Sequence, residues 1–400
     1  MVEITNGKRR PPRFLHIVPD DKFIPFVQCL YATAYPNQNQ FRVLGVDNRR
    51  RLRFVTPEPN VKVVSDNYWF SSQMKDDLNW CDCLLVHYMT PQAGRVILSA
   101  PENVTVVWMA WGGDFYHLLP AYSEDMYLPD TRAIVSELRS KGNNKAVSLP
   151  ALIKKWIRTA VFRNWEQRAI ARVDLASMLE DEHRALGKAF QGFRAEHFHF
   201  NWYYSAENIF SKGGSTIVGP DILVGNSATP TGNHVEVFDL LESSDLEGRK
   251  IIVPLSYGDD AYADEITRIG EKRFGERFVP LRTYLPIDEY NDIIASCGTV
   301  FMNHIRQQAF GNICTALFKG AKVFLRAQNP IFSFLKDKGA ILYEMPKTPA
   351  AGCDWFEPLG PGDVETNREI LLSFLSFERV VEQVKVLEKK VAERRGIEFV

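Results

Sequence analysis

Residues 299–325 read TVFMNHIRQQAFGNICTALFKGAKVFL and contain two strand-like runs, Thr299 to Met302 and Ala321 to Leu325. The first run ends in polar residues that include Arg306, and a turn with Gly311 then opens a helix. Such a turn directs free backbone N–H groups and a guanidinium at one point, and this arrangement suits a diphosphate. Glycine-led turns from strand to helix also occur throughout α/β folds. The segment therefore indicates an α/β fold and leaves open whether an anion binds there.

The length of the chain predicts two domains, because 400 residues fit two units of about 150 to 200 residues each. The hydrophobic content of 45% and aromatic content of 12% are typical of a globular protein. No apolar run approaches the roughly 18 residues that span a bilayer, which predicts a soluble or peripheral protein. The start, Met1 to Arg13, is basic and polar. We therefore expect no signal peptide and a cytoplasmic location.

The net charge and the cysteine content exclude some classes of protein. The formal net charge of -1 excludes a globally basic nucleic-acid binder, although local basic patches remain compatible with it. The six cysteines are scattered, and the closest two, Cys81 and Cys83, are separated by one residue. This spacing is too short for the usual zinc-binding pair. We expect reduced, buried thiols.

Strand-like runs alternate with helical patterns along the whole chain, which is typical of parallel α/β architecture. The runs are 13–18, 41–46, 61–64, 83–87, 104–110, 173–177 and 197–202 in the first half, and 221–224, 250–254, 277–281, 299–302, 321–325 and 340–343 in the second. A polar, Gly-rich linker at 211–215 separates the halves. We expect two doubly wound, Rossmann-like domains, 1–214 and 215–363, that face a central cleft. Charged helices follow at 364–400, and we expect them to pack back in part toward the N-terminal domain. The segment 118–149 is read as an irregular surface excursion or a lid.

Polar residues follow or lie within the strands of the first half. His16 lies inside the first run with Asp20 just past its end, and His87 ends a later run. A further run leads through two glycines into Asp114. A histidine at the carboxyl end of a central strand is well placed to meet a ligand. Three alternatives stay open: Asp20 in a solvated loop, His87 as a structural histidine and Asp114 as a helix cap.

The second half carries a comparable signal after the run at 221–224. Gly225, Asn226 and Ser227 follow it, and small polar side chains with bare N–H groups can hold phosphate oxygens. Tyr257 follows the next run and either covers a nucleobase or packs on the surface. The Rossmann glycine fingerprint and the lysine-bearing P-loop are absent, which argues against a dehydrogenase or a P-loop ATPase.

One predicted helix is strongly basic and aromatic. Helical periodicity places Trp156 on its apolar face. Its opposite side gathers Lys154, Lys155, Arg158, Phe162 and Trp165. Aromatic residues interleaved with cations are typical of a helix that lies on an anionic membrane surface, and a simple solvated face is the alternative.

In this order the segments resemble the bacterial TDP-N-acetylfucosamine:lipid transferases, glycosyltransferase family 56. The resemblance spans residues 14 to about 335 and rests on His16, His87, Trp111 to Tyr116, Ile222 to Ser227, His234, Val253-Pro254, Tyr257, Tyr262, Arg306 to Gln308, Gly311 and Asn329-Pro330. It implies a GT-B fold, a dTDP-sugar donor, no metal ion or other cofactor, and transfer of a 4-acetamido-4,6-dideoxyhexose. The implied acceptor is a polyprenyl-diphosphate-linked saccharide at the cytoplasmic face of the inner membrane, in the synthesis of enterobacterial common antigen. No nucleic-acid partner is expected.

The resemblance and the strand-end positions together give each candidate residue a role. We expect Asp114 to act as general base on the acceptor hydroxyl, with His16 and Asp20 as competitors. The expected donor-binding residues are Gly225, Asn226, Ser227, His234, Tyr257, Arg306, Gln307, Gln308, Gly311, Asn312 and Asn329. His87 and the basic aromatic helix are expected at the acceptor or the membrane.

The chain departs from the family pattern at two positions. Ala309 follows Gln307-Gln308 where the family has glycine, and Gly113 stands where alanine is usual. These departures leave the reaction class intact and the sugar and acceptor open. The alternatives are a GT-B transferase or epimerase with another nucleotide sugar and a soluble acceptor, or a non-catalytic GT-B-like binding module.

Overall fold

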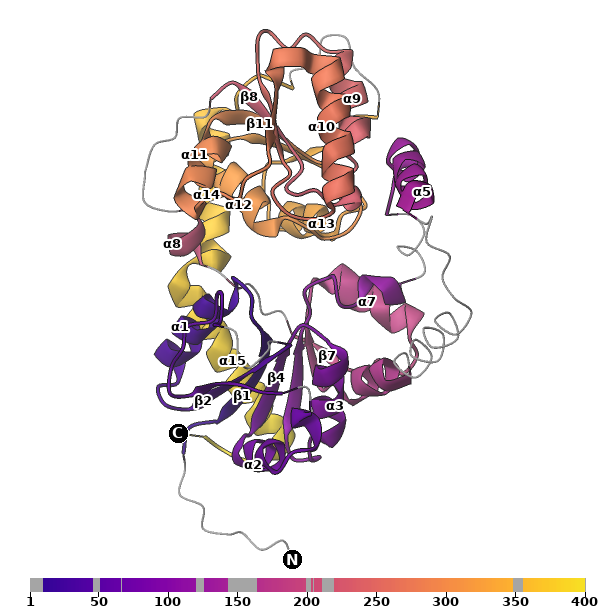
Figure 1. The fold of residues 1–400 in the computed structure, drawn as a ribbon. Coiled ribbons are helices and arrows are strands. Elements are labelled where there is room, and N and C mark those ends of the chain that lie inside the picture. Colours follow the sequence, from indigo (N-terminus) through magenta and orange to yellow (C-terminus); the bar gives the residue numbers. More distant parts are fainter. Residues whose placement is uncertain are drawn as a thin grey trace, which may run out of the picture. The chain divides into compact units, whose positions relative to one another are not determined.

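The computed structural model describes residues 10–45, 51–65, 67–119, 126–142, 164–198, 203, 205–210, 219–347 and 355–399. The chain forms two compact units (Figure 1). The first unit contains the described residues of 1–119, 148–205 and 377–400. The second contains those of 120–147 and 206–376. Each unit is a parallel sheet covered by helices, as the alternating sequence pattern predicts.

The first unit holds a parallel sheet with the strand order β3-β2-β1-β4-β5-β6-β7. Its strands are β1 (Phe14–Pro19), β2 (Asn39–Leu44), β3 (Val61–Val63), β4 (Cys83–His87), β5 (Thr105–Met109), β6 (Leu175–Ser177) and β7 (Glu196–His197). Every residue of β4 and β5 is buried. Burial on both faces explains why these strands are nearly continuous apolar runs in the sequence.

Helices cover both faces of this sheet. They are α1 (Ile24–Ala34), η1 (Tyr68–Phe70), α2 (Ser72–Trp80), α3 (Pro91–Ser99), η2 (Tyr116–Leu118), α7 (Glu180–Ala189) and α15 (Phe377–Arg395). Residues 164–172 are also helical. α15 packs beside α1, and its Val380, Val384, Leu387 and Val391 belong to the core that includes Phe14 of β1. The spacing of these four residues places them on one face of the helix.

The second unit holds a parallel sheet with the strand order β10-β9-β8-β11-β12-β13. Its strands are β8 (Asp221–Val224), β9 (Ile251–Pro254), β10 (Phe278–Leu281), β11 (Cys297–Met302), β12 (Lys322–Leu325) and β13 (Tyr343–Glu344). Its helices are α5 (Pro129–Gly142), α8 (Ala206–Ile209), η3 (Pro230–Gly232), α9 (His234–Glu242), α10 (Asp260–Phe274), η4 (Gly275–Arg277), α11 (Ile287–Ala295), α12 (Phe310–Lys319), α13 (Pro330–Asp337) and α14 (Pro361–Leu375).

Short polar side chains fix where several helices begin. The Ser71 side chain accepts from the N–H of Met74 at the start of α2, and Thr90 accepts from Ala93 at the start of α3. Asp259 caps α10 in the same way. Such caps satisfy backbone N–H groups that have no partner inside the helix.

The division of the chain differs from the expected boundaries in three places, one of which is that the second unit resumes at Ala206 and not at residue 215. The segment expected to be irregular contains α5, which packs on α9 and α10 of the second unit. Thr131 of α5 donates its backbone N–H and its hydroxyl to Glu236 of α9, at 2.9 and 2.7 Å. Of the C-terminal helices, α14 stays in the second unit against α12, and α15 alone joins the first. The expected linker at 211–215 lies outside the described residues.

Two further expectations concern cysteines and membrane spans. Of the described cysteines, Cys81, Cys83, Cys297 and Cys314 are buried free thiols, as expected, whereas Cys29 is exposed. In the part of the chain that the structure describes, no helix is both long and apolar enough to cross a bilayer.

Candidate functional site

The strand order of the second unit reverses between β8 and β11, which pair in parallel. Helical connections leave these two strands in opposite directions, so the loops after their carboxyl ends form the usual ligand-binding point of a doubly wound sheet. The loop after β8 runs from Gly225 to Asn233, and the loop after β11 runs from Asn303 to Ala309. Most of the predicted donor-binding residues lie in these two loops.

The loop after β8 wraps around His234. Gly225 has a φ of +70°, and a Cβ atom at this position would stand 2.5 Å from Nε2 of His234. A Cβ on Gly232 would stand 2.4 Å from Cε1 of the same ring. The ring is fully buried, and its Nδ1 lies 3.1 Å from the hydroxyl of Tyr262. The buried His234 ring thus packs against the loop after β8. The sequence had predicted that His234 contacts the nucleotide-sugar donor.

Gln308 connects the two loops. Its Nε2 donates to Oδ1 of Asn226 and to Oγ1 of Thr229, each at 2.9 Å. Its Oε1 accepts from the hydroxyl of Thr231 at 2.7 Å. Ser227 adds a contact of 2.9 Å between its hydroxyl and that of Thr229. This network fixes the loop after β8 against the start of α12. The sequence predicted phosphate contacts for these residues and did not predict this link between the loops.

Ala309 directs the chain into α12 with a left-handed φ of +62°. It has no side-chain oxygen, and no side chain caps the helix. Gly311 and Asn312 lie in the first turn, where N–H groups have no partner within the helix. Arg306 is half-buried just before this turn, and its Nη1 donates to the carbonyl of Gln307 at 3.1 Å. A guanidinium and a helix N-terminus therefore lie in the same short segment, which is the chemistry of an anion site.

Three other residues predicted to bind the nucleotide sugar, Tyr257, Asn312 and Asn329, differ in how exposed they are. Tyr257 is 46% exposed, and its hydroxyl accepts from Nδ2 of Asn226 at 2.9 Å. Asn312 donates to the hydroxyl of Tyr290 at 2.9 Å. Asn329 is fully buried, caps α13 and donates to the carbonyl of His304 at 3.2 Å. It therefore supports the loop after β11, whereas the sequence predicted contact with the donor.

The strand order of the first unit reverses between β1 and β4, and two histidines meet there. Nδ1 of His16 lies 3.1 Å from Nε2 of His87, and Nδ1 of His87 lies 2.9 Å from the hydroxyl of Tyr203. Both rings are at most 1% exposed. Burial lowers the pKa of His87 to about 3, and burial together with His87 holds the pKa of His16 well below its usual value. Two neutral imidazoles therefore form a buried chain that ends at Tyr203.

Asp114 ties two loops of the first unit together. Its Oδ2 accepts from the N–H of Met89 at 2.9 Å and from Nε1 of Trp108 at 2.8 Å. Its Oδ1 accepts from the N–H of Trp111 at 2.9 Å. The residue is 2% exposed, and burial raises the pKa of its carboxyl although these hydrogen bonds oppose the rise. A carboxylate that is buried and holds three donors is poorly placed to take a proton from a substrate, so the geometry does not favour Asp114 as general base.

The two carboxylates after β1 differ in what they contact. Asp20 accepts backbone N–H groups from Arg53, Phe54 and Val55 at 2.7 to 3.0 Å. Burial acts to raise the pKa of Asp20, but these three hydrogen bonds outweigh it and lower the pKa. Asp21 accepts from the N–H of Phe23 at 3.1 Å and is half-buried. Burial raises the pKa of Asp21 above its usual range. The sequence did not select Asp21, because its difference from Asp20 depends on the fold.

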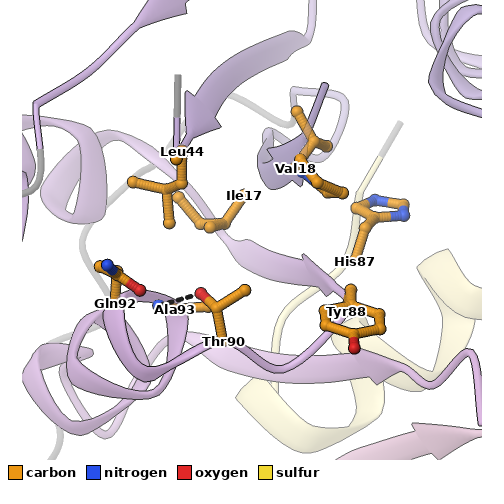
Figure 2. Close-up of a pocket in the computed structure, with 10 residues that line it drawn as sticks. Ile17, Val18, Leu44, His87, Tyr88, Thr90, Gln92 and Ala93 are labelled. Atoms are coloured by element: carbon orange, nitrogen blue, oxygen red, sulfur yellow. Dashed lines mark hydrogen bonds between the residues drawn. The ribbon is translucent and has the colours of Figure 1, made fainter. Parts of the chain in front are cut away.

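A pocket opens at the carboxyl ends of β1, β2 and β4 (Figure 2). It has an empty volume of about 280 Å³, part of it open to solvent. Ile17 and Leu44 lie on one side, and Thr90, Gln92 and Ala93 from the start of α3 lie on the other. His87 and Tyr88 also line the pocket. This pocket is at the reversal point of the first sheet, where a second ligand is expected.

Of the residues predicted for membrane contact, the structure describes His87 and Trp165. The ring of Trp165 lies 4.9 Å from the Arg95 guanidinium, which also lies 4.6 Å from the ring of Trp69. Phe70, which contacts Trp69, is 56% exposed. Lys154, Lys155, Trp156, Arg158 and Phe162 lie outside the described residues. Among the residues that are described, no three histidine, cysteine or carboxylate side chains gather as a metal site would need.

Residues 205–347 match the protein family described as 4-alpha-L-fucosyltransferase, glycosyl transferase group 56. This match confirms the resemblance over the part of the chain that holds the loops after β8 and β11. Those loops contain the Gln308 network, Arg306 and the start of α12.

The fold is similar to several solved structures. The protein Alr3699/HepE from Anabaena, in complex with UDP, shares 10% identity and a TM-score of 0.61 over 94% of this chain and 100% of that one. Sucrose-phosphate synthase from Thermosynechococcus elongatus shares 10% identity and a TM-score of 0.58 over 96% and 99%. AviGT4, a glycosyltransferase of avilamycin A biosynthesis, shares 12% identity and a TM-score of 0.50 over 96% and 98%. These likenesses establish a GT-B type fold, and with the family match they place the protein among the glycosyltransferases.

Proposed function

We propose that this glycosyltransferase moves a 4-acetamido-4,6-dideoxyhexose from a dTDP-sugar to a polyprenyl-diphosphate-linked saccharide in the synthesis of a bacterial surface polysaccharide. The observation that carries the proposal is the donor site in the second unit, where the Gln308 network, Arg306 and the start of α12 meet within the family-matched residues. A protein of the same fold is known in complex with UDP, which supports a nucleoside diphosphate as the donor's leaving group.

The second unit provides what departure of a diphosphate requires. Negative charge grows on the phosphate oxygens as the sugar leaves, and N–H groups and a cation aimed at those oxygens stabilise it. The first-turn N–H groups of α12 and Arg306 supply both, so we propose transfer without a metal ion. Tyr257, which is 46% exposed beside Asn226, is proposed to cover the nucleobase.

The first unit is proposed to bind the acceptor and to supply the general base. The acceptor hydroxyl must lose its proton as the new bond forms. Asp114 and Asp20 each use their carboxylate on three N–H donors, and His16 is fully buried. Asp21 is half-buried at the carboxyl end of β1, and its raised pKa brings it closer to the range that suits a base at neutral pH. We therefore propose Asp21 as the base.

The donor assignment is tested with nucleotides and one variant. Wild-type protein should be stabilised against heat by dTDP more than by UDP or GDP. Arg306→Ala should weaken dTDP binding by about tenfold or more, because a hydrogen bond to a charged group contributes roughly 1.5 to 3 kcal/mol. Unchanged binding in Arg306→Ala would contradict the donor site. A preference for UDP would favour the alternative of another nucleotide sugar.

The base assignment is tested with three matched carboxylates. Asp21→Asn should keep dTDP affinity and lower turnover by about 100-fold or more. Asp20→Asn should lower turnover far less. Asp114→Asn should mainly lower stability. In either orientation, the amide NH₂ group of Asn would face at least one N–H group that now donates to the Asp114 carboxylate. Since the base must be ionised, wild-type kcat/KM should fall as pH drops through the raised pKa of Asp21. Near-normal turnover in Asp21→Asn would refute this role.

Membrane attachment through the basic aromatic segment completes the proposal. Each cation near an anionic surface contributes about 1 kcal/mol. Replacing Lys154, Lys155 and Arg158 with Glu should therefore abolish co-sedimentation with anionic vesicles at moderate salt. Unchanged sedimentation would mean that the segment is an ordinary solvated face.

A further inference from the structure

His304 lies in the proposed donor site and has no contact that explains its imidazole. It follows β11 by two residues and precedes Arg306 by two. Its side chain is fully buried, yet neither Nδ1 nor Nε2 has a hydrogen-bond partner among the described residues. His16 and His234 are buried to the same degree, but each bonds through Nδ1. His304 is the histidine in the described chain with both buried ring nitrogens unpartnered.

Such an arrangement is costly for the free protein. A neutral imidazole carries one N–H donor and one acceptor, and buried polar groups in native proteins almost always have partners. An unsatisfied buried donor or acceptor loses the hydrogen bonds that water would give it. Groups of this kind persist where function requires them, since strain and unmet polar groups concentrate at ligand sites.

The segment around His304 is held firmly, so the ring is not a mobile side chain in a loose loop. The carbonyl of His304 accepts from Nδ2 of Asn329 at 3.2 Å. The preceding Asn303 donates to the carbonyl of Asn233 at 2.9 Å and accepts from Nε of Arg326 at 2.7 Å. Hydrogen bonds from α13 and from the loops after β8 and β12 thus fix the backbone that carries the ring.

The ring of His304 is uncharged in the folded protein. Burial, Arg306 and His234 all hold the pKa of His304 well below its usual value. Arg306 belongs to the same loop and His234 to α9, and these are the titratable groups that act on the ring. The neutral imidazole therefore presents one N–H and one lone pair beside the guanidinium.

We propose that His304 is a donor-binding residue whose ring N–H bonds a phosphate oxygen of the nucleoside diphosphate and whose other ring nitrogen accepts from a hydroxyl of the attached sugar. A sugar diphosphate offers this combination, because its phosphate oxygens only accept and its hydroxyls also donate. The assignment rests on the proposed function for the nature of the ligand, and it goes beyond that function in naming a residue that neither the motifs nor the resemblance selected.

The test is His304→Leu, which replaces the ring with an apolar side chain of similar size. Removing an unsatisfied buried group should leave the melting temperature of the ligand-free protein unchanged or higher. The Kd for dTDP should rise about tenfold or more, equivalent to about 1.4 kcal/mol. The Kd for thymidine, which has no phosphate, should stay the same. His304→Gln keeps an N–H donor and should retain most of the dTDP affinity.

Asn367→Leu is the matched control in the same unit. Asn367 is fully buried, and its amide bonds both backbone groups of Ile341. Its replacement should lower the melting temperature and leave the ratio of dTDP to thymidine affinity unchanged.

Two outcomes would overturn the inference, and they are distinguishable. If His304→Leu keeps the dTDP to thymidine ratio, the ring does not bind the diphosphate, and a lower melting temperature would show that its role is structural. Weaker dTDP binding in Arg306→Ala would then leave the proposed function standing. If wild-type protein binds none of dTDP, UDP and GDP, the proposed function and the inference fail together.

Discussion

Ala309 holds a backbone conformation that residues with a Cβ seldom adopt, with φ at +62°. Left-handed geometry costs a non-glycine residue about 1 kcal/mol or more. The strain lies between the Gln308 network and α12, where the chain must turn sharply to direct the helix start at the proposed ligand. The related family has glycine there, and the structure gives the physical reason. This departure therefore changes the free energy of the turn and leaves its chemistry intact.

Gly112 and Gly113 are adjacent, yet the structure predicts opposite responses to alanine. Gly112 has a φ of +88°, so Gly112→Ala should destabilise the protein by about 1 kcal/mol or more. A Cβ on Gly113 would stand 3.4 Å from the Tyr88 hydroxyl, which is an ordinary contact. Gly113→Ala should be neutral or stabilising by up to about 1 kcal/mol, because it restricts the unfolded chain. Denaturant unfolding of both variants checks this, and equal losses would contradict it.

The polar residues of the loops after β8 and β11 were predictable from the sequence, whereas the surroundings of Asp114 and His304 were not. Small polar residues after a strand are readable, and Asn226, Ser227 and Gln308 do form one network. Asp114 was selected as a base because it follows two glycines, but its three donors come from loops whose proximity only the fold creates. No sequence pattern marked His304, because the lack of hydrogen-bond partners for its ring depends on which residues surround it in the folded protein.

At the scale of elements, α15 is predicted to be essential to the first unit. Leu387 is 1% exposed in the core beside α1, whereas its neighbour Val386 is 46% exposed. Leu387→Ala should destabilise the protein by about 2 to 5 kcal/mol, as buried leucines generally do. Val386→Ala should stay within about 0.5 kcal/mol of wild type. Chemical denaturation measures both, and similar values for the pair would mean that α15 is not packed as described.

The strands were predictable and the assignment of helices to units was not. Each of the thirteen expected runs overlaps an observed strand, because parallel strands buried on both faces leave continuous apolar runs. α5 was missed, since few of its residues are apolar and its anchors, such as the bonds between Thr131 and Glu236, are tertiary. The tail was expected to return in part to the first unit, and the chain enters that unit between Ser376 and Phe377. Nothing in the local pattern marks that point.

At the scale of the molecule, each unit places its candidate residues at the reversal point of its own sheet. His16 and His87 lie where β1 meets β4, and Asn226 and Gln308 follow β8 and β11. Doubly wound sheets generally bind ligands at this point. A chain with two such sheets therefore offers two candidate ligand-binding points, which suits the proposed reaction with a donor and an acceptor.

Four buried histidines predict how the stability of the whole molecule depends on pH. His16, His87, His234 and His304 are at most 1% exposed. Burial lowers the pKa of His87 to about 3 and of His234 to about 4, and holds that of the other two well below 6.5. Below pH 6.5 the unfolded chain therefore binds protons that the folded chain does not. The stability that these groups contribute is present above pH 6.5 and is lost as pH falls towards their folded pKa values.

Each such histidine should lower the free energy of unfolding by up to about 1.4 kcal/mol per pH unit within that window. Asp21 and Asp114 act in the opposite sense, because their raised pKa values favour proton uptake by the folded state. The measurement is therefore a difference: urea unfolding of wild type and His304→Leu at several pH values between 7.5 and 5. The free energy of unfolding should depend less steeply on pH in His304→Leu, because one histidine no longer contributes. Asn367→Leu removes no titrating group and should keep the wild-type dependence. Parallel slopes for wild type and His304→Leu would show that this imidazole is already able to take up a proton in the folded protein.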